Sequence, residues 1–292
     1  MDALGCAFLP AFCSLCGSPL PQLSSAPICD VCWTEFPAQS GPACIRCGDA
    51  LNSPAGSASS SATELCRACR LAPPLFVRAV AFGLYEGRMR AAIHELKYNR
   101  LHPAAKQLGG MLAVAIAQLA EEAPAEMLVI PVPLHRTKYA ERGFNQAQSL
   151  AVHALSSLRK SHPGWRLTLA SSTLLRLRVT GSQAGLTPRQ RRLNLRGAFS
   201  VSDSSMIQSR HILLVDDIFT TGATARAAAQ SLIKAGAASV WVATLARARR
   251  IFELRLRSSF EDAENISEQN SNSAAATPQS ASIYSSQDQP SF

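Results

Sequence analysis

Two adjacent acids follow a strongly apolar stretch in the sequence LLVDDIFTTGATA (213–225). Asp216 and Asp217 end a predicted strand, and the residues that follow are mostly small or carry hydroxyl groups. A glycine-containing turn from a strand into a helix leaves backbone N–H groups without partners, and the helix dipole adds partial positive charge there. The turn at 220–224 is therefore predicted to bind a phosphate group.

The two acids before this turn need hydroxyl groups or a cation as partners, because carboxylates repel phosphate. A sugar with its 5-phosphate in the turn would present a vicinal diol to both acids, either directly or through Mg²⁺. Phosphoribosyl pyrophosphate (PRPP) has these groups. We therefore predict that PRPP binds, with Mg²⁺, to Asp216, Asp217, Thr220, Thr221, Gly222, Ala223 and Thr224. The alternative is an ordinary strand end with an Asp that caps the helix.

Eight of the nine cysteines form four CxxC pairs near the N-terminus. A CxxC turn directs two thiolates to one metal ion, and two such turns complete a tetrahedral zinc site. The spacing predicts two structural zinc sites, Cys13, Cys16, Cys29 and Cys32 for the first, and Cys44, Cys47, Cys66 and Cys69 for the second. Interleaved pairing, an iron–sulfur cluster and unmetallated pairs are the alternatives. A segment with so few large apolar side chains is expected to obtain most of its folding free energy from the metal.

The elements that must position the acids follow from the pattern of apolar residues. We expect helices at 89–99, 103–123, 145–160 and 221–236, strands at 126–135, 172–178, 210–217 and 239–247, and a strand pair or hairpin edge at 79–87. Strands that alternate with helices predict an α/β fold with a mostly parallel sheet. Ligands of such folds bind beyond the carboxyl ends of the strands, where the two acids lie.

Composition and charge restrict the function classes. The apolar content of 47% is typical of a globular protein, and the net charge of +9 indicates either an anionic partner or a basic surface without a ligand. The apolar stretch 108–120 is too short to cross a bilayer, so no membrane span is expected. The first residues lack the basic segment of a secretory signal, which predicts a cytoplasmic protein. Segment 52–63 is predicted to be a mobile loop, and 258–292 a disordered polar tail.

The segment ILLVDDIFTTGAT (212–224) is similar to the PRPP-binding signature of type I phosphoribosyltransferases. Together with the cysteine pairs and the segments 83–99, 131–151 and 180–199, it makes the chain resemble the ComF family over roughly residues 10–250. That family joins an N-terminal zinc ribbon to a phosphoribosyltransferase-like domain. It is associated with natural competence, the uptake of single-stranded DNA into the bacterial cytoplasm.

The resemblance implies three parts, namely a double zinc ribbon at 10–74, a domain of the type I phosphoribosyltransferase kind at 75–257, and the polar tail. It implies that the basic loop 131–146 holds pyrophosphate through His135, Arg136, Lys138 and Arg142. The arginine-rich segment 174–199 is interpreted as a mobile flap, with Arg178, Gln183, Arg189 and Arg192, that closes over a charged ligand or contacts DNA phosphates. His94, Lys97 and Tyr98 are expected to pack against or orient the neighbouring loop.

The partners implied are PRPP, single-stranded DNA and a competence helicase. Purine-salvage relatives carry an Asp where this chain has Thr220, which argues against a 6-oxopurine acceptor, and no catalytic residue is assigned. Two alternatives stay open. One is a metabolic phosphoribosyltransferase with an unknown acceptor, and the other is a non-catalytic zinc-ribbon adaptor that binds DNA or a helicase.

Overall fold

The computed structural model describes residues 11–22, 24–39, 41–51, 64–98, 101–178, 195 and 197–249. All of them lie within one compact unit, Met1–Arg249. The predicted loop 52–63, the polar tail 258–292 and the flap residues Gln183, Arg189 and Arg192 lie outside the described residues. No helix in the described part of the chain is both long and apolar enough to cross a membrane.

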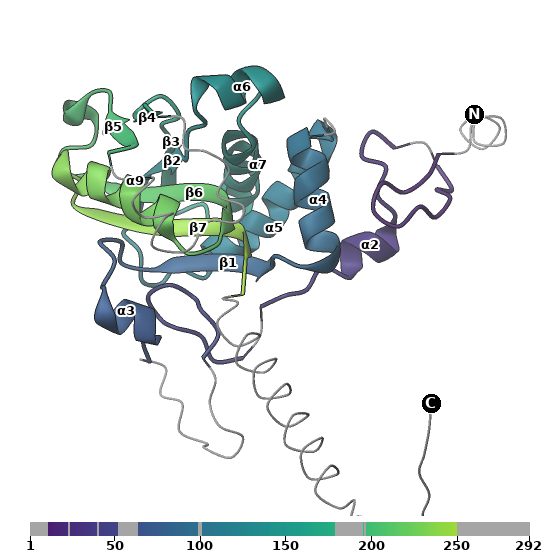
Figure 1. The fold of residues 1–292 in the computed structure, drawn as a ribbon, viewed down its shortest axis with the longest axis horizontal. Helices are drawn as coiled ribbons and strands as arrows, with labels where there is room; N and C mark the ends of the chain where they lie inside the picture. Colours follow the sequence, from purple (N-terminus) through teal and green to yellow (C-terminus); the bar gives the residue numbers. More distant parts are fainter. Residues whose placement is uncertain are drawn as a thin grey trace, which may run out of the picture. The chain divides into compact units, whose positions relative to one another are not determined.

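A five-stranded parallel sheet forms the centre of the unit (Figure 1). Its order is β1 (Ala79–Leu84), β7 (Ser239–Arg247), β6 (His211–Phe219), β2 (Glu126–Pro131) and β3 (Arg166–Leu169), and every neighbouring pair is parallel. Most residues of β2, β6 and β7 are buried, as expected for strands with both faces covered. The predicted α/β fold with a mostly parallel sheet is confirmed.

Helices cover both faces of this sheet. One face packs against α4 (Gly87–Tyr98), α5 (Ala105–Ala117) and α7 (Gln146–Ser161), and the other against α9 (Ala223–Lys234). A small antiparallel pair, β4 (Leu174–Arg176) with β5 (Phe199–Val201), also lies on the α9 side. Helices α5 and α7 approach closely at Gly109 of α5, where a Cβ would lie 2.4 Å from the Cβ of His153 in α7.

The two cysteine-rich segments lie on opposite faces of the sheet. The first, which includes α2 (Asp30–Thr34), packs into the α4 side through Cys13, Ile28 and Cys32. The second, which includes α3 (Arg67–Leu71), packs into the α9 side. Between them, Ala38 pairs with Gly83 at the outer edge of β1. The chain passes so close there that a Cβ on Gly83 would lie 2.2 Å from the backbone oxygen of Pro37.

Several elements differ from the sequence prediction. Segment 79–87 holds the single strand β1 rather than a strand pair, and 172–178 contributes only the three-residue β4, outside the main sheet. The predicted basic loop contains a helix, α6 (Arg136–Arg142), which begins after His135 and ends at Gly143 in the left-handed conformation. The helix predicted at 103–123 divides into a short 3₁₀ turn, η1 (His102–Ala104), and α5. A second 3₁₀ turn, η2 (Ser204–Met206), was not predicted.

Candidate phosphosugar site and cysteine clusters

The two acids lie where β6 loses one of its neighbours. Strand β2 pairs with β6 only as far as Pro131 and Val215, whereas β7 stays paired up to Phe219. Beyond Val215 the β2 side of β6 is therefore open for another partner. The backbone N–H of Asp217 donates to Oδ1 of Asp216 over 2.9 Å, so that part of this edge is satisfied locally.

The turn after β6 is tight, and the N–H of Ala223 donates to Oγ1 of Thr221 over 3.4 Å within it. Gly222 has φ +75° and precedes the first residue of α9, Ala223. A Cβ on Gly222 would lie 2.5 Å from Cζ of Phe219, so this position tolerates only glycine without rearrangement. Five of the seven predicted PRPP residues line one small pocket at this turn, namely Asp216, Thr220, Gly222, Ala223 and Thr224. Asp217 and Thr221 complete the segment.

Lys97 is the partner of Asp217. Its Nζ lies 2.6 Å from Oδ2 of Asp217, and the two side chains are only 15% and 6% exposed. Burial lowers the pKa of Lys97, but the charges of Asp217 and Asp216 outweigh this and raise the pKa above its ordinary value. From the sequence, Lys97 was expected only to pack against or orient a loop. The structure instead places its charge directly on the acid pair.

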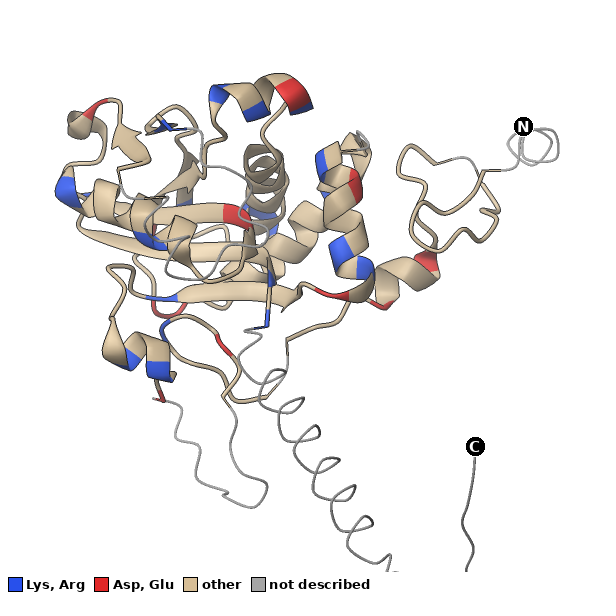
Figure 2. Ribbon diagram, viewed as in Figure 1, with Lys and Arg blue, Asp and Glu red and all other residues tan. Residues whose placement is uncertain are grey.

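Asp216 has a different electrostatic environment. Burial, and then the negative charge of Asp217, raise the pKa of Asp216 to about 8, although Lys97 opposes the rise. Arg176 of β4 acts on the same carboxyl group. Burial lowers the pKa of Arg176, the charge of Asp216 opposes this, and Arg142 adds to the lowering. Thus Lys97 of α4 interacts with both acids, Arg176 of β4 interacts with Asp216, and Arg142 of α6 acts on these two cations. Figure 2 shows the basic residues on α4 and α6.

The predicted pyrophosphate residues have unequal positions. Arg142 is half-buried, donates to Gln146 Oε1 over 3.0 Å and to the hydroxyl group of Tyr98 over 3.3 Å, and lies 5.1 Å from the centre of the Tyr98 ring. His135 caps α6 by accepting from the N–H of Thr137, and Lys138 pairs with Glu141 over 2.7 Å. Arg136 is exposed, as is Arg178 of the predicted flap. Within the predicted pyrophosphate group, Arg142 is the residue that acts on the charges around the acids.

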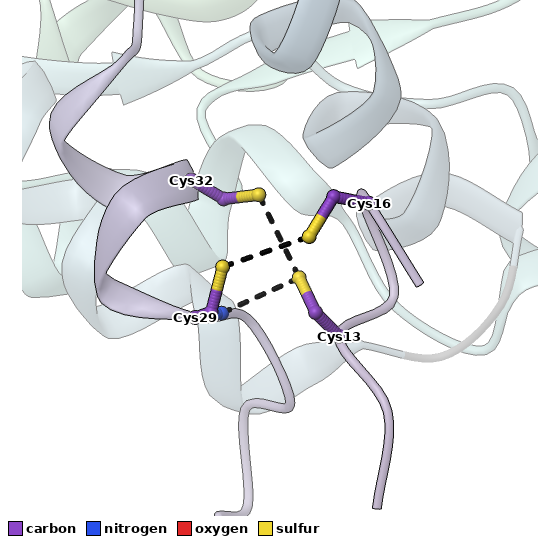
Figure 3. A group of neighbouring side chains, drawn as sticks. All are labelled: Cys13, Cys16, Cys29 and Cys32. Carbon is purple, nitrogen blue, oxygen red and sulfur yellow. Dashed lines mark hydrogen bonds between the residues drawn. The ribbon is translucent and has the colours of Figure 1, made fainter. Parts of the chain in front are cut away.

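Each group of four cysteines forms a tight cluster. Cys13 with Cys32 and Cys16 with Cys29 have Sγ–Sγ distances of 3.6 and 3.7 Å (Figure 3). Cys47 and Cys66 of the second cluster are 3.7 Å apart, and all sulfur atoms within each cluster lie within 4.8 Å of one another. Four thiolates around one Zn²⁺ are about 3.8 Å apart, so both clusters fit a structural zinc ion. The pairs group in sequence order, and interleaved pairing is wrong.

Comparisons with known proteins agree with this division of the chain. Residues 5–70 match the family model of a double zinc ribbon domain, and residues 140–278 match that of a phosphoribosyl transferase domain. The DNA utilization protein YhgH of Salmonella typhi is 33% identical over 244 residues, which cover 82% of this chain and 98% of that protein. Competence protein F of Haemophilus influenzae is 28% identical over 224 residues, or 76% of this chain and 90% of that protein. Competence protein ComFC of Bacillus subtilis is 34% identical over 121 residues, or 41% and 44%.

Proposed function

Because the chain belongs to the ComF family, with the DNA utilization protein YhgH and competence protein F among its relatives, we propose that it binds PRPP together with Mg²⁺ and acts in the uptake or use of DNA. The observation that carries the proposal is the arrangement around the acid pair. Two carboxyl groups, compensated by Lys97 and Arg176, directly precede a glycine turn at the start of a twelve-residue helix. This combination suits a ligand that carries both a phosphate group and a diol.

In this proposal each part of the ligand has its own partner. The backbone N–H groups of 220–224 hold the 5-phosphate, and Asp216, which lines the pocket, binds the ribose hydroxyl groups. Asp217 contributes through its ion pair with Lys97. Arg142 neutralises the pyrophosphate, with His135, Arg136 and Lys138 further along α6 and its N-cap. Bound Mg²⁺ would supply charge neutralisation of the pyrophosphate oxygens. Of the predicted flap residues, Arg178 is exposed, and Gln183, Arg189 and Arg192 lie outside the described residues.

The remaining parts of the chain have supporting roles in the proposal. Residues 10–74 form the double zinc ribbon, 75–257 the ligand-binding domain and 258–292 a polar tail. Four thiolates leave no open coordination position, so both zinc ions are structural. The excess of basic residues favours single-stranded DNA as a further partner, since DNA phosphates attract such a surface.

Calorimetric titration of PRPP with Mg²⁺ into the zinc-loaded protein tests the ligand. We expect binding by the native chain and a loss on the order of 100-fold or more in affinity for the double variant Asp216→Asn/Asp217→Asn, because it removes the carboxyl group that lines the pocket and the buried partner of Lys97. The control is Glu121→Gln/Glu122→Gln, which makes the corresponding acid-to-amide change at two adjacent exposed residues, of which Glu122 pairs with Arg78. No heat with the native protein, or equal affinity in both double variants, would refute the site.

The role in DNA uptake has a separate readout. A strain of the source organism with the Asp216→Asn/Asp217→Asn variant is expected to lose transformation by added DNA, whereas the Glu121→Gln/Glu122→Gln strain keeps it. Equal transformation by the two strains would show that DNA uptake does not require the acid pair. Pyrophosphate release from PRPP, measured with candidate acceptors, then distinguishes turnover from binding alone.

A further inference from the structure

One arginine joins each cysteine cluster to the phosphoribosyltransferase domain. Arg88, at the start of α4, places Nη1 3.2 Å from Sγ of Cys32 and 2.8 Å from Oε2 of Glu35. Arg247, at the end of β7, places Nη2 3.6 Å from Sγ of Cys47, and its Nη1 donates to the backbone oxygen of the same residue. Each guanidinium therefore reaches a metal-ligating sulfur. Groups in such positions orient thiolates and offset their negative charge.

The two arginines differ in burial. Arg247 and its acidic partner Asp49, 3.0 Å away, have side chains only 3% and 12% exposed. The side chains of Arg88 and Glu35 are 31% and 55% exposed. Water screens the exposed pair far more than the buried one. The link at the second cluster is therefore the stronger of the two.

Arg247 also contacts Phe219, the residue that packs against Gly222 in the phosphate turn. Its guanidinium lies 4.6 Å from the centre of the Phe219 ring, and the edge of that ring fills the space where Gly222 would carry a Cβ. The backbone is also tied, because the N–H of Ala248 donates to the oxygen of Phe219 over 3.0 Å. By contrast, Arg88 and Lys97 lie at opposite ends of α4, about 14 Å apart at 1.5 Å per residue.

We propose that Arg247 is a positioning residue through which the second cysteine cluster sets the conformation of the phosphate turn, so that the turn depends on zinc in that cluster and not on zinc in the first. The planar guanidinium can contact Asp49, Cys47 and the Phe219 ring at once. A lysine ammonium cannot reproduce this geometry. The conformational claim stands without a ligand, and its consequence for PRPP binding rests on the proposed function.

Hydrogen exchange of the zinc-loaded full-length protein, without ligand, tests the proposal. The reporters are the amides of Ala248 and Arg226, which donate to the oxygens of Phe219 and Gly222, and the amides of α5 serve as the internal reference. For Arg247→Lys we expect exchange at the reporters to rise at least about 10-fold while α5 stays unchanged. Release of one zinc ion to a colorimetric chelator should also rise, by roughly 10- to 100-fold.

Two further variants separate this link from general damage. Arg88→Lys makes the same chemical change at the first cluster and is expected to speed zinc release without affecting the reporters. Phe219→Leu keeps the contacts of Arg247 with the ribbon and is expected to retain both zinc ions while the reporters exchange faster. General destabilisation of the protein would change zinc release and reporter exchange together in both variants.

Unchanged reporters in Arg247→Lys, or an equal rise in Arg88→Lys, would overturn the proposal. If Arg247→Lys does not fold, Phe219→Leu decides, because unchanged reporters there overturn the link as well. PRPP titration of the same variants keeps the two proposals apart. If the reporters exchange faster in Arg247→Lys but the native protein binds no PRPP, the proposed ligand is wrong. The positioning of the turn by Arg247 would still be supported.

Discussion

Asp216 and Asp217 are neighbours in sequence but not in electrostatic state. Successive side chains of a strand point to opposite faces, so Asp217 meets Lys97 on the α4 side, whereas Asp216 lines the pocket with Leu214 and Thr220. Asp217 forms the ion pair with Lys97, whereas burial and the neighbouring acid raise the pKa of Asp216 and favour its protonated form at neutral pH.

This state makes stability depend on pH. With a folded-state pKa of about 8, Asp216 keeps its proton between pH 4 and 8, where the unfolded chain has lost it. The folded state then binds more protons, and the free energy of unfolding must fall as pH rises through this window. We expect Asp216→Asn to remove that slope, and urea unfolding between pH 6.5 and 8.5, where zinc stays bound, measures it.

The control for this experiment is Asp203→Asn. Asp203 is exposed, and its hydrogen bonds to Ser205 lower its pKa, so it is fully ionised in both states across the measured range. The slope should therefore persist in Asp203→Asn. A slope that persists in Asp216→Asn would contradict the assignment of the raised pKa to Asp216.

Among single residues, the acids and the turn could be predicted from sequence but Lys97 could not. The segment 212–224 is local, and each residue type in it has a direct chemical reason. Lys97 reaches the site only because α4 packs on one face of the sheet with its C-terminal end beside Asp217. Its spacing within a helix gives no sign of that partner, because one lysine at a helix end also suits a solvated surface.

At the scale of elements, two glycines at helix ends provide a matched test of the phosphate turn. Gly143 follows α6 with φ +78° and has open space where a Cβ would lie, whereas Gly222 precedes α9 with φ +75° and faces Phe219. Gly143→Ala should lose about 1–2 kcal/mol of unfolding free energy from the left-handed backbone. Gly222→Ala should lose more, because the Phe219 ring must also move against Phe76 and Arg247. If urea unfolding shows the same loss of unfolding free energy for both variants, the Phe219 ring moves aside at no measurable cost.

The long apolar elements were predictable, and the short ones were not. Strand β7 has the predicted bounds, and β6 extends the prediction to Phe219. Helix α6 was missed because its seven residues include no buried side chain, so no apolar period marks it. The hairpin expected near Gly83 was wrong for a tertiary reason, since that glycine makes room for Pro37 rather than for a turn.

For the whole molecule, the two cysteine-rich segments pack on opposite sides of the sheet that carries the acid pair. The first is attached to the start of α4, whose end carries Lys97, and the second is attached through Arg247 to Phe219. Among the described residues, neither ribbon contributes a side chain to the pocket at the turn. Their contribution to the site is therefore one of position, and each ribbon shares one of the two apolar clusters with the sheet and its helices.

This division predicts how the protein responds to the removal of zinc. Besides cysteines, the first ribbon buries only Leu20, Ile28 and Phe36 among its described large apolar side chains, so the metal must supply most of its folding free energy. Chelation should expose the amides of 11–39 and 41–51 within minutes. Amides of α5, β6 and β7 should stay protected, since most of the buried side chains around them belong to the sheet and its helices rather than to the ribbons. Hydrogen exchange with and without chelator measures both classes, and added Zn²⁺ should restore the first. If chelation removed the protection of both groups of amides at once, the sheet would be unstable without the zinc-loaded ribbons.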